Sequence, residues 1–121
     1  MNDEEQVRAV IRDYFDGLYF GDMEKFGGAF HPACRLFAVN GDEVITFDYE
    51  PYMARCAARA APATQNATRI DEIVSLTISS ADTAHARVRD AFPPRTFVNE
   101  LSFLKVAGQW KIVCKVWHAF D

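Results

Sequence analysis

The feature of this sequence that most constrains its fold is the pair of long runs in residues 97–121, FVNELSFLKVAGQWKIVCKVWHAFD. Side chains of alternating character along each run are typical of a β-strand with one packed face and one open face. Only Ala107 and Gly108 separate the two runs, and a two-residue connection is typical of a β-hairpin. These residues therefore predict a long antiparallel hairpin at the end of the chain.

Two further strand patterns precede this hairpin, at residues 69–79 and 83–92. The first half of the chain instead shows helical spacing at 3–20, from 22 to about 30 and at 49–61, with short strands at 34–39 and 43–47. Helices followed by a long meander of strands indicate an α+β fold with segregated layers. A length of 121 residues suits a single domain, which we expect to span 1–121.

Composition and charge exclude several classes of partner. The formal net charge is −4 and no run of lysine and arginine occurs, so we expect no nucleic-acid partner. No apolar run approaches the about 20 residues that a membrane-spanning helix needs, and the acidic start MNDEEQVRAV does not resemble a secretory signal. We therefore expect a cytoplasmic protein that does not bind membranes.

The cysteines and histidines give no sign of a metal or a redox centre. Three cysteines lie far apart without a C-x-x-C pair, and the three histidines show no ligand spacing. We therefore expect neither a metal nor a cofactor.

Alternation along the strands predicts which side chains share a face of the sheet. With 107–108 as the turn, Leu101 lies opposite Cys114 and Glu100 lies opposite Lys115, which pairs opposite charges. One face is then largely apolar and is expected to be concave and packed on the helices. It carries Ala84, Ala86, Val88, Asp90, Phe92, Phe97, Asn99, Leu101, Phe103, Ile112, Cys114, Val116 and His118.

Three polar side chains, Asp90, Asn99 and His118, interrupt this predicted concave face. A turn at residues 93–96 would place Asp90 directly opposite Asn99. Apolar lining with a few convergent polar groups is the usual composition of a small-molecule site, so we expect a pocket for a small apolar or aromatic ligand. The expected ligand-binding residues are Tyr14, Leu18, Phe37, Tyr52, Cys56, Val88, Asp90, Asn99, Leu101, Cys114, Val116 and His118.

The opposite, convex face is expected to form a homodimer interface. Trp117 would lie there among apolar neighbours with a charged fringe, and such a patch is typical of the core and rim of a two-fold interface. The expected interface residues are Arg87, Arg89, Val98, Glu100, Leu104, Val113, Lys115 and Trp117.

Two stretches of the sequence resemble the NTF2-like superfamily. Residues 14–39, YFDGLYFGDMEKFGGAFHPACRLFAV, resemble its first third, with the GD pair between helices and FHP before the first strand. Residues 101–120, LSFLKVAGQWKIVCKVWHAF, are similar to the end of its SnoaL-like and "putative lumazine-binding" branch. The resemblance implies an NTF2-like cone, in which a curved, mostly antiparallel sheet wraps around three N-terminal helices. It also implies a cavity and a dimer through the sheet, in a family with many uncharacterised members.

The resemblance also suggests chemistry. Tyr14 stands seven residues before the GD pair, where ketosteroid isomerases of the superfamily carry a tyrosine that donates a hydrogen bond to a developing oxyanion. The general base of those enzymes would fall near Ala38, which cannot accept a proton. A cofactor-free dehydratase, isomerase or polyketide cyclase would therefore depend on Asp90 as the base and His118 as the acid, with Tyr14 beside them.

Two other functions compete with this enzymatic one. The cavity could bind its ligand without any chemistry, which is the function we expect first. The chain could also be an accessory or adaptor domain for another protein, with Arg55 and Arg59 of the third helix forming a basic edge. The same two arginines could hold an acidic ligand if they border the cavity.

Overall fold

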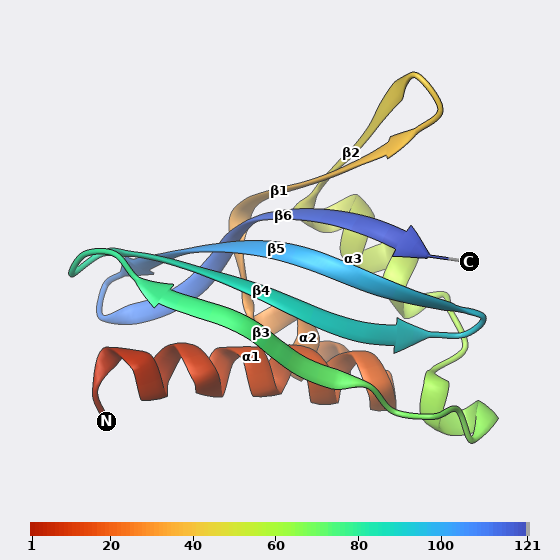
Figure 1. Cartoon of the computed structure of the whole chain (residues 1–121), viewed down its shortest axis with the longest axis horizontal. Coiled ribbons are helices and arrows are strands. Elements are labelled where there is room, and N and C mark those ends of the chain that lie inside the picture. Colours follow the sequence, from red (N-terminus) through yellow and green to blue (C-terminus); the bar gives the residue numbers. More distant parts are fainter. Residues whose placement is uncertain (121) are drawn as a thin grey trace.

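A computed structural model describes residues 1–120, which form helices packed on one six-stranded sheet (Figure 1). The helices are α1 Asp3–Phe20, α2 Met23–Gly28, α3 Tyr49–Ala57 and the short 3-10 helix η1 Pro62–Gln65. The strands are β1 Phe30–Asn40, β2 Glu43–Asp48, β3 Asp71–Ile78, β4 Thr83–Phe92, β5 Arg95–Val106 and β6 Gln109–Phe120. The expected α+β fold is confirmed.

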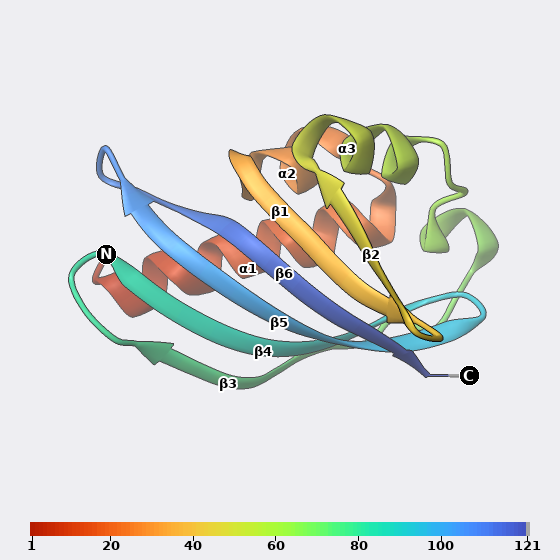
Figure 2. The same cartoon turned by 90° about the horizontal axis from the view of Figure 1, so that it is seen from above.

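The strands follow the order β2-β1-β6-β5-β4-β3 across the sheet. Every neighbouring pair is antiparallel except β1 and β6, which run parallel. Figure 2 shows the strands in this order, with the helices on one side of the curved sheet. We call the face toward the helices the concave face and the opposite one the convex face.

The first helix begins and ends at the residues that the sequence predicts. Asn2 accepts a hydrogen bond from the Glu5 backbone and completes a capping box, and Gly21 ends the helix with a φ of 69°. Asp22 then caps α2 by accepting from two backbone N–H groups. The predicted second helix is too long, because it ends at the Gly27-Gly28 pair and β1 already begins at Phe30.

The core forms where one side of α1 meets the concave face. Val7, Ile11 and Tyr14 of α1 are completely buried, as are Leu101 of β5 and Ile112 of β6. Burying one side chain of this size contributes about 1.5–3 kcal/mol, so the contact of α1 with the sheet holds the two layers together. Within residues 1–120, no helix is both long enough and apolar enough to span a membrane.

The predicted pairing of the last hairpin is correct only as far as Phe103 and Ile112. Beyond that pair the register shifts, because Ser102 pairs with Cys114 and leaves Val113 as an extra residue in β6. One extra residue forms a β-bulge and reverses which later side chains point to which face. The predicted faces of the C-terminal half of β6 were therefore wrong.

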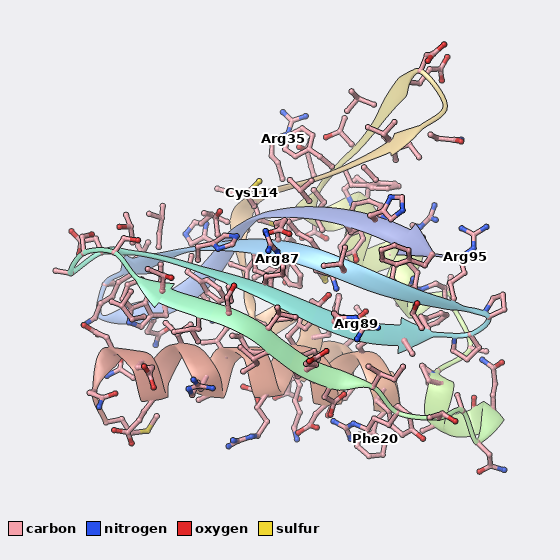
Figure 3. All side chains as sticks on the ribbon, viewed as in Figure 1. Phe20, Arg35, Arg87, Arg89, Arg95 and Cys114 are labelled. Carbon is pink, nitrogen blue, oxygen red and sulfur yellow. The ribbon has the colours of Figure 1, made fainter. Side chains whose placement is uncertain are left out.

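The bulge moves Lys115 and Trp117 from the predicted convex face to the concave one. Lys115 is 6% exposed, and Trp117 packs partly buried against the core. Conversely, Cys114, Val116 and His118 lie on the convex face. Figure 3 shows Cys114 pointing away from α1.

The predicted register of β4 and β5 was also wrong, although the faces were right. The turn contains Pro93 and Pro94 alone, so Asp90 pairs with Phe97 and not with Asn99. The shift is by two residues and preserves the alternation. Asp90 and Asn99 therefore still share the concave face, as diagonal neighbours.

Candidate functional site

A cavity of about 130 Å³ lies between the helices and the C-terminal half of the sheet. One buried water needs roughly 10–15 Å³, so this cavity has room for a small organic molecule. Its lining residues come from α1, from α3 and the turn after it, and from strands β4, β5 and β6. They are Tyr14, Leu18, Tyr52, Arg55, Arg59, Asp90, Phe92, Arg95, Phe97, Asn99, Lys115, Trp117 and Ala119.

The buried end of the cavity contains an acid and an amide in contact. The Asn99 Nδ2 group donates a hydrogen bond to Asp90 Oδ2 at 3.0 Å, and these residues are 1% and 3% exposed. Burial raises the pKa of the Asp90 carboxyl, while the Lys115 charge, the Asn99 amide and the Tyr14 hydroxyl partly offset that rise. The nearby Asp71 charge adds to the rise, so Asp90 holds a proton more tightly than an exposed aspartate does.

Lys115 is the basic group of the buried end. Its Nζ donates a hydrogen bond to the Tyr52 hydroxyl at 2.9 Å and lies 5.1 Å from the centre of the Tyr14 ring. Burial lowers the pKa of Lys115 to about 8, and Arg59 adds to this effect, whereas Asp90 acts in the opposite direction. The amine is thus fixed in position and easily deprotonated.

Two polar atoms at the buried end have no hydrogen-bond partner within residues 1–120. They are the Tyr14 hydroxyl, which lies near the Asp90 carboxyl without forming a hydrogen bond to it, and Asn99 Oδ1, one able to donate and the other to accept. Leaving a buried polar group unsatisfied costs about 1–3 kcal/mol. Burial raises the pKa of Tyr14 well above its usual value, and the nearby Asp90 charge adds to the rise, so this hydroxyl keeps its proton.

The open end of the cavity is rich in arginine. Arg55 and Arg95 are exposed, and Arg59 is half-buried with its guanidinium 4.1 Å from the centre of the Phe92 ring. The Arg59 Nη2 group donates to the Cys56 Sγ at 3.3 Å. Among the described residues that line the cavity, Arg55, Arg59 and Lys115 face one carboxylate, Asp90. The cavity is therefore cationic in a chain with a net charge of −4.

Aromatic rings form one wall of the cavity. Trp117 stacks on Phe47 with ring centres 6.4 Å apart, and it also contacts Tyr52 with centres at 6.2 Å. Phe92 and Phe97 lie in the strands that line the cavity. Flat rings of this kind are suited to a flat apolar ligand.

The comparison with protein families agrees with this fold. A family model described as "putative lumazine-binding" matches residues 2–118. The chain belongs to this family. No match was found among curated proteins.

Solved structures similar to this member of the putative lumazine-binding family are NTF2-like. One is an NTF2-like protein of unknown function from Shewanella baltica, with 20% identity, 98% of this chain and 94% of that chain covered, and a TM-score of 0.87. A second, from Silicibacter pomeroyi, shows 22% identity and a TM-score of 0.83, and the match covers 99% of this chain and 100% of that chain. A ketosteroid isomerase-like protein from Erwinia carotovora atroseptica shows 14% identity and a TM-score of 0.76, and the match covers 100% of this chain and 99% of that chain. At these identities the likeness shows the fold, and the predicted NTF2-like fold is confirmed.

The cavity of this putative lumazine-binding family member contains five of the twelve residues predicted to bind ligand. These are Tyr14, Leu18, Tyr52, Asp90 and Asn99. Cys56 lies in a small adjoining hollow. Val88 and Leu101 share the concave face but are completely buried in the core.

The other four predicted ligand-binding residues were wrongly placed. Phe37, Cys114, Val116 and His118 lie on the convex face; the bulge accounts for the three in β6. In β1 the neighbours of Phe37, Leu36 and Ala38, are buried, so alternation turns Phe37 outward. The proposed catalytic trio is therefore not assembled, because Tyr14 and Asp90 meet in the cavity and His118 packs on Phe120 outside it.

Sequence reasoning missed Lys115 and Trp117, which are central to the cavity. The signal was the run Ile112-Val113-Cys114, three consecutive apolar residues directly after the alternating residues 109–111. Such a break in alternation is what a bulge produces. Within residues 1–120 no group of three or more histidine, cysteine or acidic side chains is arranged to hold a metal.

Proposed function

We propose that this chain binds a small, flat organic anion in its cavity. The observation that carries the proposal is the excess of cationic side chains around an aromatic cavity in an acidic protein. The apolar body of the ligand would contact the ring of Trp117, and its anionic group would meet the arginines at the open end. The Tyr14 hydroxyl and Asn99 Oδ1, which are unpartnered at the buried end, would bond a polar group of the ligand.

Arg59 is the arginine best placed to hold the anion. It is half-buried, and its Nε is buried without a hydrogen-bond partner in the described chain. A hydrogen bond to a charged group contributes about 1.5–3 kcal/mol, which corresponds to a change in affinity of at least about tenfold.

The test measures binding of 2-naphthoate and of its neutral amide by calorimetry. We expect the wild type to prefer naphthoate, and Arg59→Gln to weaken naphthoate binding by at least about tenfold. Arg35→Gln is the matched control, because Arg35 also stacks on a phenylalanine ring but lies exposed on the convex face, as Figure 3 shows. Equal binding of the acid and the amide, with no effect of Arg59→Gln, would contradict the proposal.

We further propose that the chain is a homodimer through its convex face. The bulge removes Lys115 and Trp117 from the predicted interface, and it adds Val116 and Phe120, which are 44% and 47% exposed. Leu104 of β5 and the cross-strand pair Val39 and Val44 are exposed on the same face. Several exposed apolar side chains on one face of a sheet are typical of a surface that another protein covers.

A further inference from the structure

Lys115 differs from the other three lysines of the chain in its surroundings. Lys25 is exposed, Lys105 forms an ion pair with Asp3 at 3.0 Å, and Lys111 donates to the Gly28 carbonyl. Among the described residues that line the cavity, Lys115 is the one amine. Its Nζ is within 6 Å of the ring centres of Tyr14, Tyr52 and Trp117.

We infer that the Lys115 amine is a nucleophile that condenses with the carbonyl group of an aldehyde or ketone bound in the cavity and forms an imine. The inference rests on the proposed binding function and narrows the ligand to a flat, anionic carbonyl compound. The hydrogen bond from Nζ to the Tyr52 hydroxyl fixes the amine at the buried end. The arginines at the open end would hold the anionic group, so the carbonyl group would point inward to Lys115.

The reaction needs no oxidant or reductant. The lone pair of the neutral Nζ attacks the carbonyl carbon, a C–N bond forms, and the carbonyl oxygen becomes a hydroxyl group after proton transfer from the nitrogen. Loss of that hydroxyl as water, with a proton supplied by a neighbouring acid, breaks the C–O bond and leaves a C=N bond whose nitrogen still carries one proton. That proton then returns to the conjugate base of the acid, which leaves the neutral imine. One amine and one carbonyl compound thus give one imine and one water.

The neighbours of Lys115 have the functions that these steps require. The unpartnered Tyr14 hydroxyl can donate a hydrogen bond to the carbonyl oxygen, where negative charge develops during attack. Asp90 acts on Lys115 through its charge, and burial raises the pKa of its carboxyl group. A carboxyl group whose pKa is raised by burial is a stronger base than an exposed one, and it can take up the amine proton and return it to the departing water.

Burial also supplies the neutral amine. With a pKa of about 8 instead of 10.5, Lys115 is about one-tenth neutral at neutral pH, roughly 300-fold more than an ordinary lysine. Removing a lysine from water is an established way to activate it for imine formation. The geometry and the protonation state therefore favour the same reaction.

The experiment traps the imine in the wild-type chain. The protein is incubated with 4-carboxybenzaldehyde and sodium cyanoborohydride, and peptide mapping by mass spectrometry follows the reduced adduct at each amine over time. We expect Lys115 to be modified at least about 100-fold faster than Lys25, because its neutral fraction is larger. Benzoate should slow the reaction at Lys115 but not at the exposed Met1 amino group. Modification of Lys115 no faster than that of Lys25 would overturn the inference.

Variants and a second probe separate this inference from the proposed function. Lys115→Met should abolish the cavity adduct, and Lys111→Met should leave it unchanged; if Lys115→Met does not fold, the mapping in the wild type decides. Naphthoate binding without an adduct at Lys115 would reject the imine and retain the anion site. Equal rates with 4-carboxybenzaldehyde and uncharged benzaldehyde would support the imine and reject the anion site.

Discussion

At the scale of single residues, Lys115 connects the charge of the cavity to the stability of the fold. Its pKa is about 8 in the folded chain, against an ordinary value of 10.5. Between these values the unfolded chain binds more protons than the folded chain, and stability rises with pH under that condition. The stabilising contribution of Lys115 is therefore present above pH 10.5 and is lost as the pH falls through 8.

This linkage predicts a difference between the wild type and Lys115→Met. From about pH 7 to about pH 10.5, the free energy of unfolding of the wild type should rise by about 3 kcal/mol relative to the variant, at about 1.4 kcal/mol per pKa unit. Urea unfolding at a series of pH values measures this difference. Lys111→Met, on the same strand but outside the cavity, is the control and should follow the wild type. If the free energy of unfolding changed with pH in the same way for the wild type and Lys115→Met, folding would not lower the pKa of Lys115.

At the scale of elements, the position of the cavity depends on the close contact of α1 with α2. A Cβ atom built on Gly17 of α1 would lie 2.5 Å from the Phe26 backbone nitrogen of α2. Only glycine permits this approach, which supports the α1 turn that carries Tyr14 and Leu18 into the cavity. A Cβ built on Gly28, the last residue of α2, meets nothing within 4 Å.

Replacing each of these helical glycines by alanine should therefore have opposite effects. Alanine favours a helix by roughly 0.5–1 kcal/mol over glycine, and Gly28→Ala should be stabilising by up to about that amount. Gly17→Ala should instead lower the free energy of unfolding by about 1–3 kcal/mol, because overpacking at backbone atoms cannot relax. Chemical denaturation of both variants compares the two sites directly. A Gly17→Ala variant as stable as Gly28→Ala would contradict the close contact.

The elements also show how far the sequence could predict the site. Periodicity and capping residues locate α1 and the long strands, because these signals are local and repeat over many residues. Alternation places Asp90 and Asn99 on one face even though their register was wrong by two, since a two-residue shift preserves faces. Alternation fails at Val113, because this one extra residue reverses the faces of residues 115–118. Whether a strand forms a bulge or stays regular is decided by tertiary packing, which the local pattern does not contain.

At the scale of the whole molecule, the bulge shapes both faces of the sheet. On the concave face it directs Lys115 and Trp117 into the cavity, and on the convex face it leaves Val116 and Phe120 beside exposed apolar residues of β1 and β2. The lining of the cavity and the apolar outer face therefore depend on the same extra residue. The outer face is the part that a second copy of the chain would cover.

The homodimer proposed for that face predicts the effect of one buried charge. Wild-type protein should sediment as a dimer, and Val116→Glu should sediment as a folded monomer, because an unpaired carboxylate inside an interface costs several kcal/mol. Val74→Glu is the matched control: Val74 is 47% exposed, close to the 44% of Val116, but lies in the edge strand β3 at the far side of the sheet. Circular dichroism checks that both variants fold. A monomeric wild type, or dissociation by Val74→Glu and not by Val116→Glu, would show that the convex face around β6 is not the interface.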